Sequence, residues 1–230
     1  MDDTQVRRGP IFLCLGLMLL FPLFSTTMEH AVGSLARIHG ELPARAISEG
    51  AIWSYGAVVL AIALFGERRT LASIGLGRPG IWAPLWGIGA AIALLALGGV
   101  ASFITYQVLH APNHTPAQIE ALVRGSLGYA LLLAIRAGVI EEIFYRGLAI
   151  EQLTVLTGNR LLAAAVATLA FVAVHLVHFD LRQLIPIAVA SSGLAALYLW
   201  KRNLWINIIA HTLIDALALS IVAVHATKLY

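Results

Sequence analysis

Long apolar stretches separated by short polar segments occupy most of this sequence. Seven of them span residues 10–28, 50–66, 81–109, 123–144, 160–179, 183–200 and 204–225. A helix needs roughly 20 apolar residues to cross a bilayer, and most of these stretches are close to that length. We therefore expect an all-α fold, a polytopic transmembrane helical bundle of about seven spans.

The composition agrees with a membrane protein and excludes an ordinary soluble domain. Hydrophobic residues make up 60% of the 230 residues and charged residues only 12%, and the mean hydropathy is +0.86. No long Pro, Ser or Gly linker interrupts the chain, so we expect a single integral membrane domain over residues 1–230, with the lipid bilayer as its main partner. The net charge of +3 has no run of like charges behind it, so nucleic acid is not an expected partner.

The distribution of basic residues predicts the orientation of the chain. With a cytoplasmic N-terminus, nine Lys and Arg residues lie at inside span ends and five at outside ones, which favours that orientation. The inside set is Arg7, Arg8, Arg68, Arg69, Arg78, Arg146, Arg160, Lys201 and Arg202, and the outside set is Arg37, Arg45, Arg124, Arg182 and Lys228. The short loops and alanine-rich spans are typical of a bacterial cytoplasmic membrane protein.

The segment GVIEEIFYRG, residues 138–147, places two carboxylates and an arginine at an apolar span. A charge inside a bilayer costs roughly 2.5–3.5 kcal/mol on insertion scales, so these residues are functional candidates. Glu142 and Arg146 are four residues apart and can pair on one helix face. Glu141 points about 100° away and stays available as a base. A purely structural ion pair explains the pattern equally well when it is taken alone.

Two later spans carry further polar sets. Phe171 and His175 are four residues apart in FVAVHLVHFD, and His211 and Asp215 are four apart in WINIIAHTLIDA. A single histidine in an apolar helix is usually structural, but three spans with such sets predict a shared polar cavity, because unpaired polar groups in a membrane are costly. Such a cavity suits water activation, or a divalent metal held by His and carboxylate ligands.

As a set, these residues resemble a known family. Glu141-Glu142-x-x-x-Arg146, Phe171-x-x-x-His175 and His211-x-x-x-Asp215 occur in the order found in the CPBP family of intramembrane proteases, which includes the type II CAAX prenyl endopeptidases. The resemblance covers residues 125–220, the predicted catalytic core, and residues 67–77 resemble the loop that precedes this core in many members.

The resemblance implies peptide-bond hydrolysis in a cavity within a helical membrane fold. Glu141 would be the general base that activates water, with help from His175. His211 and Asp215 would stabilise the oxyanion or orient the substrate carbonyl. The resemblance assigns a structural role to Glu142 and Arg146, which would hold the motif helix in place. It assigns a packing role to Phe171.

Asp215 departs from the prenyl endopeptidases, which have Asn at this position. An ionised carboxylate accepts hydrogen bonds but cannot donate one to an oxyanion. Asp215 must then be protonated, orient His211, or ligate a metal. A Zn²⁺ ion held by His175, His211 and Asp215 and a metal-free mechanism both remain open at this stage.

The sequence therefore predicts an intramembrane endopeptidase that acts on a peptide or membrane-associated protein through glutamate-activated water. Whether the substrate is prenylated is left open. The alternatives are a non-catalytic membrane scaffold or bacteriocin immunity protein, and a proton-relaying transporter. We expect Ser191 to be a helix-packing residue and Arg136 to be a support residue at most. Tyr145 could donate a hydrogen bond to a carboxylate, but a position at the membrane interface is the preferred interpretation.

Overall fold

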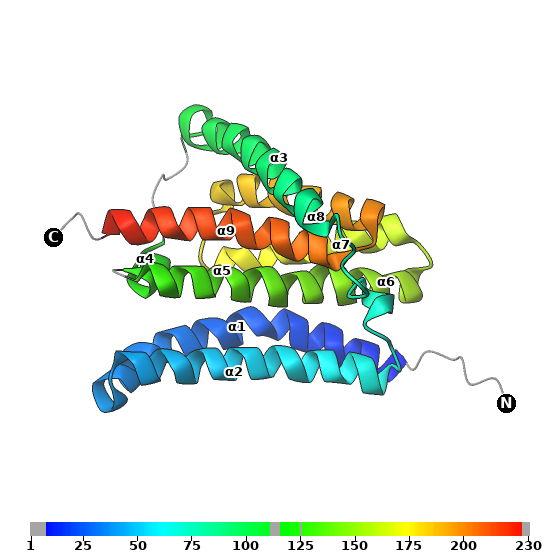
Figure 1. The fold of residues 1–230 in the computed structure, drawn as a ribbon, viewed down its shortest axis with the longest axis horizontal. Coiled ribbons are helices and arrows are strands. Elements are labelled where there is room, and N and C mark those ends of the chain that lie inside the picture. The colour runs from blue at the N-terminus through cyan, green and yellow to red at the C-terminus, as the bar shows by residue number, and fades with distance from the viewer. Residues whose placement is uncertain (1–7, 111–115, 125, 227–230) are drawn as a thin grey trace. The chain divides into compact units, whose positions relative to one another are not determined.

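The structure is a computed structural model that describes residues 8–110, 116–124 and 126–226. Arg7 and Lys228, which entered the orientation count, lie outside these residues. All regular elements in the described part are helices, which confirms the all-α prediction (Figure 1). The chain divides into two compact units, residues 1–71 and 72–230. The single domain over residues 1–230 stays a prediction.

The first unit is a helical hairpin. Helix α1 (Arg8–His39) is followed by α2 (Glu41–Ala61), which continues as the π-helix η1 (Ile62–Gly66), and the two run side by side in Figure 1. Gly40 joins them with a φ of 86°, a left-handed conformation that glycine adopts without strain. The ring of Tyr55 stacks on Phe24 with centroids 4.7 Å apart, and its hydroxyl donates to the Leu17 carbonyl at 2.8 Å. These contacts hold α2 against α1.

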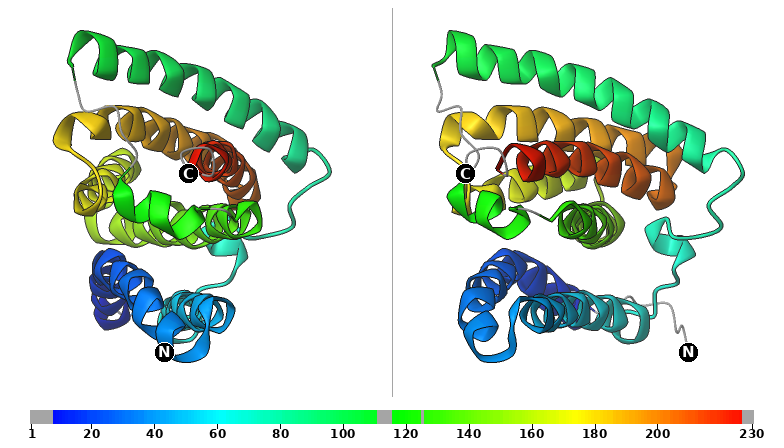
Figure 2. Two further views of the ribbon diagram at one scale, coloured as in Figure 1. Left: turned by 90° about the vertical axis from the view of Figure 1, so that its left-hand side faces the viewer. Right: turned by 60° about the vertical axis from the view of Figure 1, so that its left-hand side comes forward.

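The second unit contains all three motifs. Its longer helices are α3 (Ala83–Phe103, continued by the π-helix η3, Ile104–Val108), α5 (Leu127–Glu141), α7 (Arg160–Val174), α8 (Leu184–Lys201) and α9 (Leu204–Ala226). Its shorter ones are η2 (Ala72–Ile74), α4 (Ala117–Val123), the π-helix η4 (Glu142–Ala149), α6 (Ile150–Thr157), η5 (His175–Val177) and η6 (Leu181–Gln183). Helix α9 packs against both α3 and α5, and α8 packs against α3 and α7 (Figure 2).

Six helices of the described part are long and apolar enough to cross a membrane. They correspond to six of the seven predicted spans, although α1 extends to His39 and α2 begins at Glu41, well before residue 50. The remaining predicted span, 123–144, is helical from Leu127 but is not among the six. Large apolar side chains on these helices are exposed, such as Leu85, Ile92 and Leu169 at 61%, 64% and 68%. Such surfaces suit a lipid environment, so this is an integral membrane protein.

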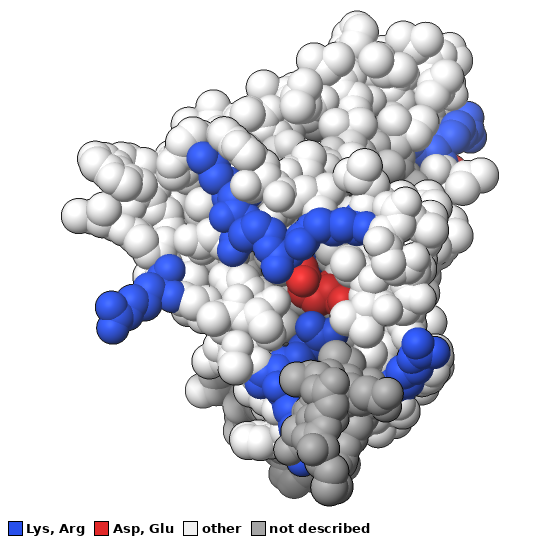
Figure 3. Space-filling view, turned by 90° about the vertical axis from the view of Figure 1, so that its right-hand side faces the viewer, with Lys and Arg blue, Asp and Glu red and all other residues white. Residues whose placement is uncertain are grey.

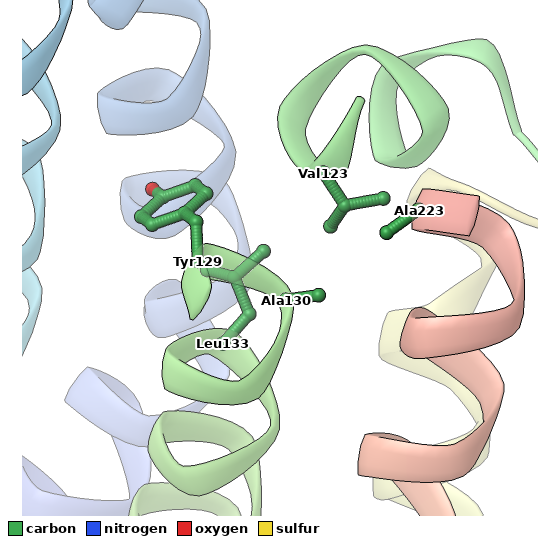
Figure 4. Close-up of a cluster of buried hydrophobic side chains, with 5 residues drawn as sticks. All are labelled: Val123, Tyr129, Ala130, Leu133 and Ala223. Carbon is green, nitrogen blue, oxygen red and sulfur yellow. The ribbon is translucent and has the colours of Figure 1, made fainter. Parts of the chain in front are cut away.

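Small residues allow the helices of the second unit to approach closely. A buried apolar cluster joins Val123 on α4, Tyr129, Ala130 and Leu133 on α5, and Ala223 on α9. In Figure 4 the side chains of Val123, Ala130 and Ala223 point toward one another between these helices. A second cluster of Ala91, Leu94, Leu194 and Ala210 joins α3, α8 and α9. The small side chain of alanine lets the helix backbones approach closely. Van der Waals packing between such surfaces drives helix association in a membrane.

Helices α5 and α9 approach each other closely at Gly138. A β-carbon added there would lie 2.9 Å from the backbone nitrogen of Thr212 on α9. We expect Gly138→Ala to destabilise the protein by roughly 1–3 kcal/mol, because the two helices must separate. Gly128 on the same helix has open space around it, so Gly128→Ala should change stability by less than about 1 kcal/mol. The free energy of unfolding, measured by titration with a denaturing detergent, checks this pair, and equal stability of both variants would contradict it.

Charged side chains gather where α6 and α8 end and α7 begins. The buried carboxylate of Glu151 accepts hydrogen bonds from Arg160, Arg202 and the hydroxyl of Tyr198. The Nζ atom of Lys201 lies 3.4 Å from the ring centroid of Trp86. Figure 3 shows basic and acidic side chains on the face of the molecule that lies at the right of Figure 1. Arg160, Lys201 and Arg202 all belong to the set expected in the cytoplasm, and the orientation itself stays a prediction.

Candidate active site

The first motif lies where the helix geometry changes. The helix that begins at Leu127 is α-helical to Glu141 and π-helical from Glu142 to Ala149. Single π-helical turns inside α-helices are rare and are found frequently at functional sites. Glu141, the predicted base, is the last residue before this change, and Glu142 and Arg146 lie within it.

Glu142 is the centre of a buried polar network. Its side chain is fully buried, and its Oε1 atom accepts a hydrogen bond from Arg146 at 2.7 Å. The same oxygen is 2.8 Å from Nδ1 of His211, and Oε2 accepts from the amide of Asn207 at 3.2 Å. A carboxylate with this many partners can be buried at tolerable cost. Glu142 therefore joins the motif helix to α9 as well as to its own Arg146.

Arg146 extends the network to two further helices. Its guanidinium donates to the hydroxyl of Ser191 at 2.9 Å and to the carbonyl of the same residue at 3.2 Å. Its Cζ atom lies 4.5 Å from the ring centroid of Phe171. The prediction that Ser191 only packs helices was incomplete, because its hydroxyl accepts a hydrogen bond from a buried arginine. Arg146 thus connects η4 with α8 and α7.

His211 lies among three carboxylates. Because the Glu142 carboxylate is an acceptor, Nδ1 of His211 carries a hydrogen that it donates to Glu142. Its Nε2 atom lies 3.4 Å from Oδ2 of Asp215 and 4.0 Å from Oε2 of Glu141. The fixed Nδ1 contact orients the ring, so that Nε2 is aimed at the two partly exposed carboxylates.

The two adjacent glutamates lie in different environments. The side chain of Glu142 is 0% exposed, whereas that of Glu141 is 22% exposed. Glu142 is held by Arg146 and Asn207, while the nearest ion-pair contact of Glu141 is the 4.0 Å approach to His211. The geometry suits a fixed support for Glu142 and a more accessible, reactive carboxylate for Glu141.

His175 is at the C-terminal end of α7. Its Nδ1 atom lies 2.7 Å from the carbonyl oxygen of Phe171, which only accepts, so Nδ1 carries the hydrogen. In the neutral ring, Nε2 is then an acceptor. The imidazole packs on Phe171 with centroids 4.5 Å apart and interacts electrostatically with Glu141. His175 is therefore connected to the site by its ring contact with Phe171 and by its electrostatic interaction with Glu141.

The structure brings the three motifs together but leaves some nearby polar residues outside. Phe171 contacts the rings of both His175 and His211, with centroids 4.5 and 6.1 Å apart. Asp180, the residue that follows the fifth predicted span, is exposed and caps η6 by accepting from the backbone of Arg182. Arg136 interacts electrostatically with Glu141, consistent with a support residue.

One buried polar residue of the site, Asn207, was not predicted from the sequence. Asn207 lies four residues before His211, so the same helical spacing that linked His211 to Asp215 could have indicated it. Tyr145 is buried, at only 4% exposure, and its position relative to the membrane interface stays a prediction. Its ring packs edge-on against Phe171 with centroids 5.0 Å apart.

The predicted zinc ligands were tested against the donor geometry. Among the described residues, no group of three or more His, Cys, Asp or Glu side chains is arranged to hold a metal ion. Nδ1 of His175 donates to a carbonyl and Nδ1 of His211 to Glu142, an arrangement that leaves Nε2 of each ring as the atom able to bind a metal. As they lie here, the side chains of His175, His211 and Asp215 do not form such a group.

Comparison with known proteins supplies independent evidence on the family. Residues 123–217 match the family model described as type II CAAX prenyl endopeptidase Rce1-like. The match contains all three motifs and nearly coincides with the predicted core of residues 125–220. No curated protein and no solved structure matches the chain significantly. The matched segment holds Glu141, His175, His211 and Asp215, and the match supports membership of the CPBP family that includes the Rce1-like proteins.

Proposed function

We propose that this protein is an intramembrane endopeptidase that hydrolyses peptide bonds by glutamate-activated water. The observation that carries the proposal is the meeting of Glu141, His211 and Asp215 beside a buried supporting network, within the segment that matches the family. The partly exposed Glu141 is the general base, and its carboxylate takes a proton from water as the water oxygen attacks the carbonyl carbon.

His175 positions the attacking water. With Nδ1 donating to the Phe171 carbonyl, its Nε2 atom can accept the second hydrogen of the same water. Two acceptors on one water, Glu141 and His175, orient the oxygen lone pair toward the substrate. When the tetrahedral intermediate collapses, the C–N bond breaks and the proton held by Glu141 passes to the leaving nitrogen. The products are a free carboxylate and a free amine.

His211 stabilises the oxyanion of the tetrahedral intermediate. Protonated on both nitrogens, the ring donates through Nδ1 to Glu142 and through Nε2 to the negative oxygen. Asp215, 3.4 Å from Nε2, balances the charge of the ring and holds its direction. Asp215 therefore orients His211. The Asn found at this position in the prenyl endopeptidases could instead donate a hydrogen bond directly to the oxyanion.

The support for this arrangement is the network around Glu142. Arg146 balances the charge of Glu142, and Asn207 fixes its second oxygen. Ser191 does not act as a nucleophile in this proposal, because its hydroxyl already accepts from Arg146 and no histidine contact of it is found among the described residues. Hydrolysis therefore proceeds without an acyl intermediate.

We propose a peptide or membrane-associated protein as the substrate and the bacterial cytoplasmic membrane, with a cytoplasmic N-terminus, as the location. Large exposed apolar surfaces on the helices support access from the bilayer. The test is cleavage of a quenched-fluorescent peptide library, with and without a prenyl group on the peptides, by the purified protein in detergent. Cleavage of any member supports the endopeptidase. Binding of peptides without cleavage across the library would favour the scaffold or immunity protein.

The proposed mechanism also predicts the response to metal removal. Because no step uses a metal ion, we expect kcat to change by less than about twofold after incubation with a strong zinc chelator and dialysis. A zinc protease of known chelator sensitivity, assayed in the same detergent, is the positive control. A loss of activity that is restored by added Zn²⁺ would contradict the metal-free mechanism. It would instead support His175, His211 and Asp215 as Zn²⁺ ligands.

A further inference from the structure

Tyr145 carries a buried hydroxyl that the mechanism above does not use. Its side chain is 4% exposed, and its oxygen has no hydrogen-bond partner among the described residues. Most buried polar groups in proteins are hydrogen-bonded, and an exception calls for an explanation such as a catalytic role. The ring is fixed edge-on against Phe171, which itself contacts His175 and His211. The unpaired hydroxyl is therefore held beside the candidate active site.

The spacing of the first motif relates this hydroxyl to Glu141. Tyr145 follows Glu141 by four residues, just as Arg146 follows Glu142 by four. Glu142 and Arg146 are joined by a 2.7 Å hydrogen bond. In the parallel pair of Glu141 and Tyr145, no hydrogen bond joins the two side chains. Side chains four residues apart on a helix are neighbours, so a rotation of the Glu141 side chain is enough to close this second pair.

Glu141 is the partner that can move. Its side chain is 22% exposed, whereas the Tyr145 ring is packed against Phe171. In the present structure the Glu141 carboxylate faces His211, with Oε2 4.0 Å from Nε2. This distance is longer than a hydrogen bond, so no strong contact opposes the rotation.

We propose that Tyr145 is a positioning residue for the general base, whose hydroxyl donates a hydrogen bond to one carboxylate oxygen of Glu141 and leaves the other oxygen for the attacking water. This inference rests on the proposed function, in which Glu141 activates water. Tyr145 acts through Glu141 and does not itself touch the reacting atoms. A base held by one oxygen presents the other in a single direction, which reduces the misalignment that slows proton transfer.

The test is Tyr145→Phe, which removes only the hydroxyl. We expect kcat for a cleaved library peptide to fall about 10- to 100-fold, because the base is less well positioned. KM should stay within about twofold, since no substrate contact is lost. The thermal unfolding temperature should not decrease, because the lost hydroxyl had no partner in the resting structure. A structural role would instead lower stability.

Tyr198→Phe is the matched control. The Tyr198 hydroxyl is also buried, but it donates to Glu151 at 3.1 Å, outside the site. Its removal leaves the Glu151 acceptor short of a partner, so stability should fall while kcat stays within about twofold. Tyr145→Phe should thus lower kcat without lowering stability, and Tyr198→Phe should lower stability without lowering kcat.

Glu141→Gln in the same assay separates the inference from the proposed function. Loss of activity in both Glu141→Gln and Tyr145→Phe, with stability retained, supports the positioning role. Loss in Glu141→Gln with wild-type kcat in Tyr145→Phe overturns the role of Tyr145 and leaves the endopeptidase standing. Wild-type activity in Glu141→Gln overturns the proposed function and the inference with it. A lower unfolding temperature in Tyr145→Phe also overturns the inference, whatever its kcat.

Discussion

Replacing Glu141 with glutamine should lower kcat for peptide cleavage by roughly 10²- to 10⁴-fold, the range that a general base contributes. The amide has nearly the shape of the carboxylate but cannot take a proton from water. Because the Glu141 side chain is 22% exposed and makes no buried ion pair at hydrogen-bond distance, the substitution should leave the fold intact. The measurement is the initial rate with a single cleaved peptide, together with the thermal unfolding temperature of each variant.

Glu120→Gln is the control for this substitution. Glu120 on α4 pairs with Arg124 on the exposed surface at 3.2 Å, away from the motifs. We expect its kcat to match the wild type within about twofold, since exposed ion pairs contribute little. Equal rates in the wild type and Glu141→Gln would remove Glu141 from the chemistry, whatever the family match implies.

Replacing Arg146 with methionine should destabilise the protein by about 3–5 kcal/mol, the cost of breaking a buried ion pair by removing one partner. Arg146 is 1% exposed, balances the buried Glu142, and donates to Ser191. Methionine fills much of the volume, so the loss reports mainly on charge and hydrogen bonding. The free energy of unfolding, measured by titration with a denaturing detergent, checks this prediction.

Two variants control the Arg146 experiment. Arg182 is 51% exposed and lies 3.8 Å from Asp180, so Arg182→Met should cost less than about 1 kcal/mol. The double variant Glu142→Gln with Arg146→Met should be less destabilised than the sum of its single changes, because it leaves no uncompensated buried carboxylate. A loss below about 1 kcal/mol in Arg146→Met would show that the pair is not essential for the fold.

The helices were predictable because most of the apolar stretches are about as long as a helix that crosses a bilayer and contain few charged residues. Six of the seven expected spans correspond to candidate membrane helices. Helix ends were less predictable: α1 continues to His39 because the polar residues after position 28 are compatible with a helix. The π-helical segment after Glu141 was not predictable, because it depends on how η4 packs against its neighbours rather than on the residues of the segment alone.

The candidate site was predictable where residues repeat at a spacing of four. This spacing identified Glu142 with Arg146 and His211 with Asp215, and both pairs are in contact. Contacts between distant segments were not predictable: the Nδ1 contact of His211 goes to Glu142, 69 residues away. Ser191 illustrates the same limit, since only the fold brings its hydroxyl to the guanidinium of Arg146.

The most direct test of the account is mass spectrometry of the products that the purified protein forms from one cleaved peptide, with hydroxylamine present to trap any acyl intermediate. We predict two fragments whose masses sum to that of the peptide plus one water, no hydroxamate product, and no fragments from Glu141→Gln. Fragments formed equally by Glu141→Gln, or a hydroxamate in place of the free carboxylate, would contradict hydrolysis by water that Glu141 activates.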